Sequence, residues 1–501
     1  MKNLDFFSRK LEHLYTITHS NMLPAIRDVS MSLYQVIAFS VNPFYIQLFY
    51  CIFMSLLGYL LLKVSMPRTQ VRPKDLDLFF TSVSASTVSS MTVIEKEVFS
   101  NSQLILISFL MLAGGEVFIS LLGLEFSKFN LTQEHCAKNK ASTLQIPDQA
   151  LPNANESIEL AIVSLPHPLH QKQSDSDFGS DGITVSSDDK LKYNSTKFLG
   201  YTVLGYLMVV HLFGSSLVSL YISLIPSARE VLRSKGLNLL TFSFFTVISS
   251  FSNCGFLPTN ENMIVFKKNS GLLLLIIPLI YLGNTLYPPC LRVLIWFLKK
   301  ITRREELSYI LRNYREMGFD HLLSDLHCWL LVGTVVGFTL TQFAMFCFME
   351  WNSENMDGLD FYQKLVCSLF QVVNARHAGE SVFHLNSISA AILVLFMVMM
   401  YLPPYTKFLP ARDQENDTNK GKRSLVECLL FSQLSYLVIF IIVICITESK
   451  SLREDPLNFN VFNITLEVIR HVSLSLSHQT DYKLHFIKTK KDLMNLLNEH
   501  S

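Results

Sequence analysis

Charged residues are scarce in this sequence, and the shortage limits what kind of protein it encodes. Asp, Glu, Lys and Arg make up 17% of the 501 residues, whereas a soluble domain contains about 25%. The formal net charge of +1 argues against a nucleic acid as a partner, because proteins that bind nucleic acids carry a positive excess. Half of the residues are hydrophobic, Phe alone occurs 38 times, and the mean hydropathy is +0.31. This composition indicates a membrane protein.

Motifs of enzymes and of bound cofactors are also missing. The sequence contains no Gly-x-x-x-x-Gly-Lys-Ser/Thr loop, no His-Glu-x-x-His pair and no Gly-x-Ser-x-Gly turn. Its nine cysteines include no Cys-x-x-Cys pair, and we interpret them as small hydrophobic residues within helices. We therefore expect neither an enzyme nor a protein with a resident metal or cofactor.

Long apolar runs, by contrast, are frequent. A helix that crosses a bilayer needs about 20 predominantly apolar residues. Seven stretches meet this requirement, namely 44–64, 103–124, 198–225, 271–298, 328–349, 387–406 and 425–447. The residues before the first stretch carry Lys2, Arg9, Lys10 and Arg27 among scattered polar residues, and they lack the short apolar region and the small-residue cleavage site of a secretory signal. We therefore expect the first span to stay in the protein and to act as its own insertion signal.

The charges of the loops predict the orientation of these spans. Basic residues gather between spans four and five and between spans six and seven, at Lys299, Lys300, Arg303, Arg304, Arg312, Arg315, Lys407, Arg412, Lys420, Lys422 and Arg423. The loop 350–361 has four acidic residues and no basic one. Because basic loops stay in the cytosol, we expect a cytosolic N-terminus. The basic stretch Met66–Lys74 lies outside in this arrangement and conflicts with it.

One pattern occurs three times: a long apolar span, a shorter half-polar stretch, and a second apolar span. The stretches end at Thr87-Val88-Ser89-Ser90, Asn253-Cys254-Gly255-Phe256 and His377-Ala378-Gly379-Glu380. Each stretch is either an ordinary outer loop or a half-helix and loop that re-enter the membrane beside a water-filled cavity. Their three equivalent positions favour re-entrant loops. The expected fold class is an all-α membrane protein of repeated membrane–pore loop–membrane units around a central ion pore.

A fourth repeat begins near Leu425 and is incomplete. After Ile469 the sequence supplies neither a small-residue turn nor a closing apolar span, so we expect seven strong spans instead of eight. Residues 126–197 are rich in Ser and Asp without apolar periodicity, which predicts a disordered cytosolic linker. The expected organisation is a cytosolic N-terminus 1–43, unit A 44–125, the linker 126–197, unit B 198–298, a basic cytosolic loop 299–327, unit C 328–409, a second basic cytosolic loop 410–424, a partial unit D 425–469 and a polar tail 470–501.

The small residues at the ends of the loops suit contact with a cation. A cation leaves water only where other oxygens replace its hydration shell, and rings of backbone carbonyls do this. Carbonyls converge most easily where glycine permits unusual backbone angles, as at Gly255 and Gly379. Ser89 and Ser90 take this place in the first unit, which predicts a narrower or differently oriented wall. The half-helices would point their partially negative C-terminal ends at the pore centre.

Ionisable residues in or beside the spans have two interpretations each. Glu380 follows Gly379 and either concentrates cations at the outer mouth or is a solvated loop residue. Glu116 lies in the middle of a span and either contacts ions or packs against a polar neighbour. Arg292 either has a functional role or extends its side chain to the inner surface. Glu427 is a further candidate of this kind.

Several segments resemble the plant high-affinity potassium transporters (HKT), a family of the Trk/Ktr superfamily. The resembling segments are Asp77–Met91, Asn253–Asn262, Gln371–Glu380 and Met399–Tyr405, and the resemblance covers about 44–469 outside the linker. It implies four membrane–pore–membrane units around one ion path, with one filter residue from each unit. Carried onto this sequence, the filter residues are Ser90, Gly255 and Gly379. Ser89 is a less favoured alternative to Ser90, and Cys254 and Glu380 are filter neighbours.

The resemblance also implies an activity. Serine at the first filter position is typical of the sodium-selective subfamily 1, whereas glycine there accompanies potassium–sodium transport. We therefore expect passive, uniporter-like movement of Na⁺ across the plasma membrane, with potassium–sodium cotransport as the alternative. Each charge gains about 2.3 kcal/mol per 100 mV of membrane potential. The expected partners are Na⁺, with K⁺ as the alternative, the lipid bilayer and a second copy of the chain in a homodimer.

The sequence departs from this family after Ile469. Family members continue with a glycine-containing fourth filter and an eighth span, whereas here no glycine follows Gly421. This predicts an aberrant C-terminus that arises from alternative splicing, a frameshift or an error in the gene model. The alternative function is a truncated, non-conducting isoform of the same family. An ion-coupled carrier would need ionisable residues that converge at the bilayer midplane, and the spans contain few.

Overall fold

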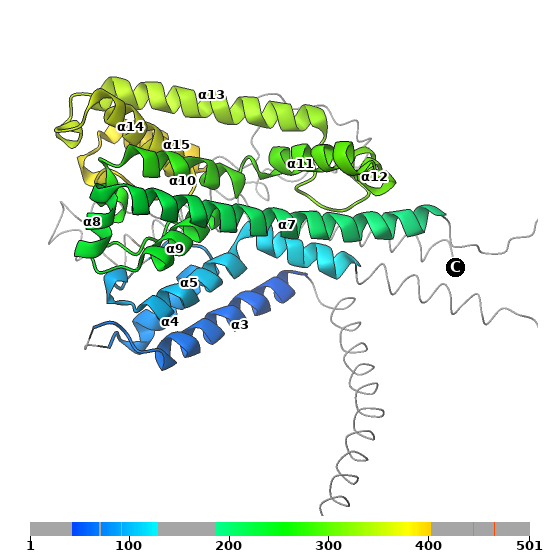
Figure 1. The fold of residues 1–501 in the computed structure, drawn as a ribbon, viewed down its shortest axis with the longest axis horizontal. Helices are drawn as coiled ribbons and strands as arrows, with labels where there is room; N and C mark the ends of the chain where they lie inside the picture. The colour runs from blue at the N-terminus through cyan, green and yellow to red at the C-terminus, as the bar shows by residue number, and fades with distance from the viewer. Residues whose placement is uncertain are drawn as a thin grey trace, which may run out of the picture.

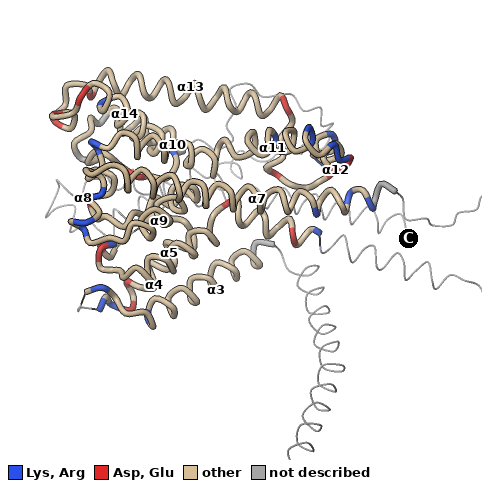
Figure 2. Tube along the Cα trace, viewed as in Figure 1, with Lys and Arg blue, Asp and Glu red and all other residues tan. Residues whose placement is uncertain are grey.

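The structure is a computed structural model that describes residues 43–69, 72–91, 93–128 and 187–401, together with Ile444 and Thr465. Within these residues every secondary-structure element is a helix, and the long helices lie side by side in an elongated bundle (Figure 1). Lys, Arg, Asp and Glu gather at the two ends of this bundle, and few lie between (Figure 2). Charged ends and an apolar middle suit a protein that crosses a membrane.

Three helices among the described residues are long and apolar enough to cross a bilayer by themselves. They are α3 (Pro43–Val64), α7 (Ser187–Leu224) and α13 (Asp325–Glu350). Large apolar side chains on them face outward, since Phe49, Trp329 and Phe348 are 70%, 75% and 91% exposed. A soluble protein rarely exposes apolar faces of this extent, whereas lipid covers them at no cost.

Two of the expected spans are broken helices. The span predicted at 103–124 consists of α5 (Asn101–Gly114) and a helix over Glu116–Lys128, bent by 56°. The span predicted at 271–298 consists of α10 (Ser270–Leu282) and α11 (Tyr287–Thr302), bent by 83°. Pro288 and Pro289 lie in the first turn of α11. Proline is tolerated there because the N–H groups of the first turn have no partner within the helix.

The predicted linker 126–197 is wrong at both of its ends. Residues 126–128 still belong to the helix over Glu116–Lys128, and α7 already begins at Ser187. The N-terminal part of α7 packs against α12 (Glu305–Arg312), where Ser195 Oγ donates to the Glu306 carbonyl (3.4 Å). Helical propensity alone does not reveal a partner so far along the chain.

Other predicted regions lie partly or wholly outside the described residues. The span predicted at 387–406 is represented by α15 (Ala390–Tyr401). The N-terminus 1–42, most of the linker, the second basic loop 410–424, the predicted span 425–447 and the tail 470–501 lie outside the described residues, apart from single positions.

Three shorter helices lie between the long ones. They are α4 (Asp75–Ser86), α9 (Leu239–Ser252) and α14 (Phe361–Arg376). Each has an exposed apolar residue in its first turn, Leu76, Leu240 or Phe361, and buries most of its C-terminal half. All three lie in the left half of the bundle in Figure 1, whereas α11 and α12 lie at its right end. Helix α8 (Pro226–Ser234) joins α7 to α9. The 3₁₀ turns are Lys96–Val98, Asn262–Phe266, Glu354–Met356 and Leu385–Ser387.

Two glycines fix the helix breaks against the ends of the short helices. A Cβ added at Gly114 would lie 2.1 Å from the Ser86 carbonyl oxygen at the end of α4. A Cβ added at Gly283 would lie 1.8 Å from the Phe251 carbonyl oxygen near the end of α9. We call α3–α5 the first group of helices, α7–α11 the second and α13–α15 the third. The same close approach thus occurs in the first and second groups, and a side chain at either glycine would prevent it.

Candidate selectivity filter

The chain leaves each short helix by the same turn. In all three, a backbone N–H donates to the carbonyl five residues earlier, the bond that closes helices in the Schellman motif. These bonds join Ser89 to Ser84 (2.9 Å), Cys254 to Ser249 (2.9 Å) and Gly379 to Asn374 (3.0 Å). The residues after each turn have no regular secondary structure, so their backbone polar groups are not used by a helix.

The three residues expected to form the filter share one backbone conformation. The φ angles of Ser90, Gly255 and Gly379 are +67°, +72° and +76°. This left-handed conformation costs a non-glycine residue about 1–2 kcal/mol, whereas glycine adopts it freely. Ser90 holds it without glycine, so the surrounding structure must impose the conformation there.

These segments meet in space. A Cβ added at Gly255 would lie 1.8 Å from the carbonyl oxygen of Ala378 and 3.3 Å from Ser90 Oγ. Ala378 directly precedes Gly379, so the first, second and third groups of helices each bring one segment to this point. Ser90 rather than Ser89 makes the contact, and Ser89 instead donates its hydroxyl to Ser84 Oγ (3.1 Å). Cys254 is fully buried beside Gly255.

The loops beyond this point are hydrogen-bonded to one another in chain order. The Glu97 N–H donates to Asn260 Oδ1 (3.3 Å), and the Asn260 N–H donates to Glu97 Oε1 (3.2 Å). The Ser381 N–H donates to Asn262 Oδ1 (3.1 Å), and the Met263 N–H donates to the Ser381 carbonyl (3.1 Å). The first loop is therefore joined to the second, and the second to the third.

Glu380 is not a solvated loop residue. Its side chain is buried, with 1% of the residue exposed, and its Oε1 accepts a hydrogen bond from Ser250 Oγ (2.6 Å). Ser250 belongs to α9, so this bond ties the residue after Gly379 to the second short helix. The sequence could not distinguish a buried from a solvated carboxylate here, because the burying residues lie more than 100 positions away.

The neighbouring residue His377 ties the third loop to the break between α10 and α11. His377 Nδ1 lies 2.8 Å from the Val373 carbonyl and its Nε2 lies 3.0 Å from Thr285 Oγ1. A carbonyl only accepts, so Nδ1 carries the hydrogen and Nε2 accepts from the Thr285 hydroxyl. The neutral imidazole is thereby held on both sides, directly before Ala378. The sequence analysis did not single out this histidine.

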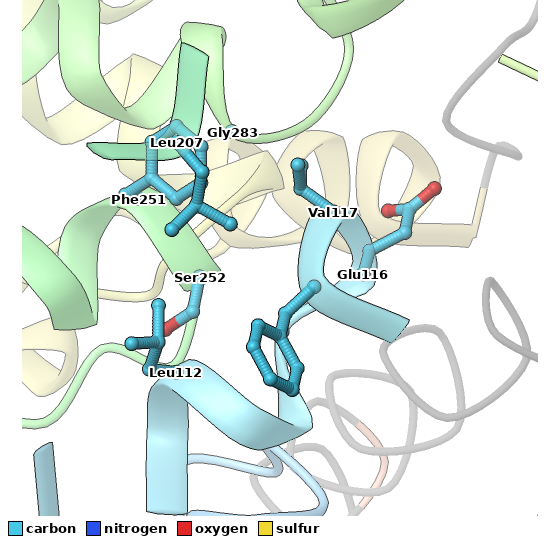
Figure 3. A pocket seen from close by; sticks show the side chains of 9 residues that line it. Leu112, Glu116, Val117, Leu207, Phe251, Ser252 and Gly283 are labelled. Atoms are coloured by element: carbon cyan, nitrogen blue, oxygen red, sulfur yellow. The ribbon is translucent and has the colours of Figure 1, made fainter. Parts of the chain in front are cut away.

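A small cavity lies between the two helix breaks and the end of α9. It is lined by Leu112, Gly115, Glu116, Val117, Phe118, Leu207, Phe251, Ser252 and Gly283, most of which Figure 3 labels. Glu116 Oε1 lies 3.8 Å from His321 Nδ1, and the Glu116 side chain is 12% exposed. The interpretation of Glu116 as packed against a polar neighbour therefore agrees with the structure.

Arg292 does not extend to the surface. It is 9% exposed, and its guanidinium donates to the carbonyls of Leu323 (2.6 Å) and Leu311 (3.4 Å) and pairs with Asp325. These bonds fix α11 to the loop before α13, which is a structural role. Glu427 lies outside the described residues.

A charged residue that the sequence analysis did not single out lies beside the meeting point. Lys96 is 5% exposed, and its Nζ lies 3.9 Å from the ring centroid of Phe256, the residue after Gly255. In the sequence it stands between two glutamates, which is the pattern of a solvated charged turn.

Comparison with known proteins gives matches over most of the chain. The family model TrkH, described as cation transport protein, matches residues 171–406. The sodium transporter HKT1 of Arabidopsis thaliana is 48% identical over 416 residues, which cover 81% of this chain and 78% of that protein. The cation transporter HKT1;3 of Oryza sativa subsp. japonica is 44% identical over 434 residues, covering 85% and 79%. The potassium transporter TRK1 of Candida albicans is 24% identical over 370 residues, covering 68% and 35%.

Proposed function

The chain belongs to the HKT family of cation transporters, and on that premise we propose that it conducts Na⁺ passively and selectively across the plasma membrane. Family membership makes it a membrane cation transporter and not an enzyme. The relative with 48% identity is named a sodium transporter, which supports Na⁺ as the ion. The predicted units A (44–125), B (198–298) and C (328–409) each contribute one wall of the ion path.

One observation carries the proposal: Ser90 and Ala378, the residue before Gly379, both lie directly against Gly255. We propose Ser90, Gly255 and Gly379 as the filter, with Cys254 and Glu380 as its neighbours and Ser89 behind Ser90. The C-terminal ends of α4, α9 and α14 lead into these three positions, and their partial negative charge favours a cation. Backbone carbonyls freed by the left-handed turns would replace the hydration shell of the ion.

Ser90 is the residue that favours Na⁺ over K⁺. Its hydroxyl lies 3.3 Å from where a Gly255 side chain would begin, so it occupies space that a glycine would leave open. A narrower opening with one more oxygen ligand suits the smaller ion. Potassium–sodium cotransport is the alternative, and it would require this hydroxyl to leave K⁺ passage unaffected.

The mechanism we propose is uniport, driven by the membrane potential at about 2.3 kcal/mol per charge per 100 mV. Coupled transport needs a site that a second ion loads and empties. Among the described residues, Glu116 lies beside His321 and Arg292 is paired with Asp325. Both groups are thus engaged in packing within one half of the bundle.

Voltage clamp of cells that express the chain tests this function. The reversal potential should shift by about 59 mV for each tenfold change in external Na⁺, and little when K⁺ is changed in the same way. Gly255→Ala should abolish the current, since its methyl group would overlap the Ala378 carbonyl. Equal shifts with Na⁺ and K⁺ would contradict sodium selectivity, and a conducting Gly255→Ala variant would contradict the filter.

A second candidate function is a non-conducting subunit that assembles with intact relatives in a dimer. The observation that favours it is the absence of glycine after Gly421, where a fourth filter would need one. Co-expression with a conducting HKT relative should then lower the current of that relative. An unchanged current, with both proteins at the cell surface, would exclude this function.

A further inference from the structure

Lys96 is buried where its neighbours are not. It begins the 3₁₀ turn Lys96–Val98 between α4 and α5, outside the spans. The exposed Glu95 accepts through Oε2 from Asn260 Nδ2 (3.0 Å), and the partly exposed Glu97 pairs through Oε1 with Lys235 Nζ (3.0 Å). Lys96 instead turns inward and is 5% exposed. A lysine is almost never buried to this degree unless its charge is compensated.

The Lys96 ammonium group lies over two aromatic rings. Its Nζ lies 3.9 Å from the ring centroid of Phe256 and 5.8 Å from that of Phe99. Both rings are buried, with 2% and 1% exposed. The face of an aromatic ring attracts a cation, and more so away from water. Burial lowers the pKa of Lys96 to about 8, so the amine remains mostly protonated at neutral pH.

The position of Phe256 brings this charge close to the proposed filter. A phenylalanine ring centroid lies about 4 Å from its own Cα, and adjacent Cα atoms are about 3.8 Å apart. The Lys96 ammonium group therefore lies within roughly 12 Å of Gly255. Two unit charges at that distance, with an effective dielectric constant of about 20, change an equilibrium constant about tenfold. The Debye length in physiological salt is about 8 Å, and salt screens buried charges much less than exposed ones, so we expect a change of about three- to tenfold.

We propose that Lys96 is a fixed positive charge that weakens cation occupancy of the outer part of the filter and so sets the Na⁺ concentration at which transport saturates. The inference rests on the proposed function, because it assigns the ion path to Gly255. Weaker occupancy lets an ion leave the site more readily, which a conducting filter requires.

Lys96→Met is the variant of choice. Methionine is unbranched, similar in length and able to pack on aromatic rings, so it keeps the contacts with Phe256 and Phe99 and removes the charge. Lys96→Arg keeps the charge and serves as the rescue variant. Lys63→Met is the matched control, since Lys63 also lies over a tyrosine ring, at 5.5 Å, but its side chain is 49% exposed and pairs with Asp75.

Two readouts report on occupancy. The first is the Na⁺ concentration that gives half-maximal current in voltage clamp. The second needs no conduction: the thermal stability of the purified chain rises with Na⁺ as the ion binds the folded state, and the midpoint of that rise is measured. Lys96→Met should lower both values about three- to tenfold, and Lys96→Arg and Lys63→Met should leave them within about twofold.

Salt dependence separates charge from packing. When ionic strength is raised with an impermeant organic cation, the difference between Lys96→Met and the natural chain should shrink, whereas a packing effect would persist. If the natural chain responds to Na⁺ and Lys96→Met has the same half-maximal Na⁺ concentrations, this inference is overturned and the proposed function stands. A natural chain with neither Na⁺ current nor Na⁺-dependent stabilisation would overturn the proposed function and this inference together.

Discussion

Ser90 is a serine in a backbone conformation that suits glycine, with a φ of +67°, and substitution to glycine therefore has two effects. Ser90→Gly removes a strain of about 1–2 kcal/mol and removes the hydroxyl near Gly255. We expect the variant to fold at least as well and to admit more K⁺, with a severalfold higher permeability of K⁺ relative to Na⁺. Reversal potentials in mixed Na⁺ and K⁺ solutions measure this ratio.

Ser89→Gly is the matched control for Ser90→Gly. The φ angle of Ser89 is not positive, and its hydroxyl donates to Ser84 Oγ near the end of α4 (3.1 Å). The control should therefore leave the permeability ratio as it is. Unchanged selectivity in Ser90→Gly, or a larger change in Ser89→Gly, would remove Ser90 from the filter.

Gly255 gives the sharpest steric prediction at the residue scale. A methyl group there would lie 1.8 Å from the Ala378 carbonyl oxygen, which no small shift relieves. Gly255→Ala should lower the unfolding temperature and abolish Na⁺-dependent stabilisation of the purified chain. Gly205→Ala on α7 is the control, since nothing lies within 4 Å of its added Cβ, and alanine there should stabilise the helix by about 1 kcal/mol.

Single residues also show what the sequence could not reveal. Gly255 and Gly379 were identified because glycine at the end of a repeated turn has a backbone meaning. The sequence did not reveal that Glu380 and Lys96 are buried. Their burial depends on Ser250 and on Phe256, which come from a different part of the chain. A charged residue in a loop is usually solvated, and only packing changes that.

At the scale of elements, the glycines at the helix breaks carry the next prediction. A Cβ added at Gly283 would lie 1.8 Å from the Phe251 carbonyl oxygen. Gly283→Ala must therefore push α10 away from α9. We expect a loss of about 1–3 kcal/mol in the free energy of unfolding, the usual cost of overpacking. Gly333→Ala on α13, where nothing lies within 4 Å, is the control. Equal thermal stability of the two variants would contradict the packing described.

The bond between Thr285 and His377 links the break before α11 to the third filter segment. Thr285→Val keeps the shape and removes the hydroxyl that donates to His377 Nε2 (3.0 Å). We expect weaker discrimination between Na⁺ and K⁺ with unchanged expression, because the imidazole before Ala378 loses one of its two anchors. Thr285→Ser restores the hydroxyl and should restore selectivity. Equal permeability ratios in the valine and serine variants would deny the bond a role in positioning.

Helices were easier to predict than their interruptions. Apolar length located α3, α7 and α13, because a helix that crosses a bilayer needs little else. The 56° and 83° bends depend on contacts between Gly114 or Gly283 and the short helices, so composition alone did not locate them. The helical residues 187–197 likewise depend on α12, whose Glu306 carbonyl receives Ser195.

For the whole molecule, the resemblance to a family and the structure support each other over residues that the structure describes. The loops joined through Asn260 and Asn262 hold the three groups of helices in chain order, as a path between units requires. The fourth unit, for which the sequence predicts an aberrant end, lies outside the described residues apart from Ile444 and Thr465. The non-conducting alternative predicts that the chain as given carries little Na⁺ current, whereas the proposed function predicts a measurable one. A robust sodium-selective current would show that a glycine-containing fourth filter is dispensable.

The orientation of the bundle in the membrane is the last prediction. Charges lie at both ends (Figure 2), so the charge distribution alone is ambiguous, and the conflict at Met66–Lys74 remains. Several basic residues lie near Arg304 and none lies in the loop around Asp357, and this asymmetry predicts that Arg304 is in the cytosol. Both residues are exposed, so either can be replaced by cysteine without disturbing the packing.

A membrane-impermeant maleimide added to intact cells should therefore label Asp357→Cys and not Arg304→Cys, and permeabilised cells should show labelling of both. The natural chain is the background control: among the described residues Cys254, Cys328 and Cys367 are buried and should react slowly, whereas Cys51, Cys290 and Cys347 are partly exposed and set the background to be subtracted. Labelling of Arg304→Cys in intact cells would show that the bundle has the opposite orientation in the membrane. The filter loops would then open to the cytosol, and Lys96 would face ions that leave the cell rather than ions that enter it.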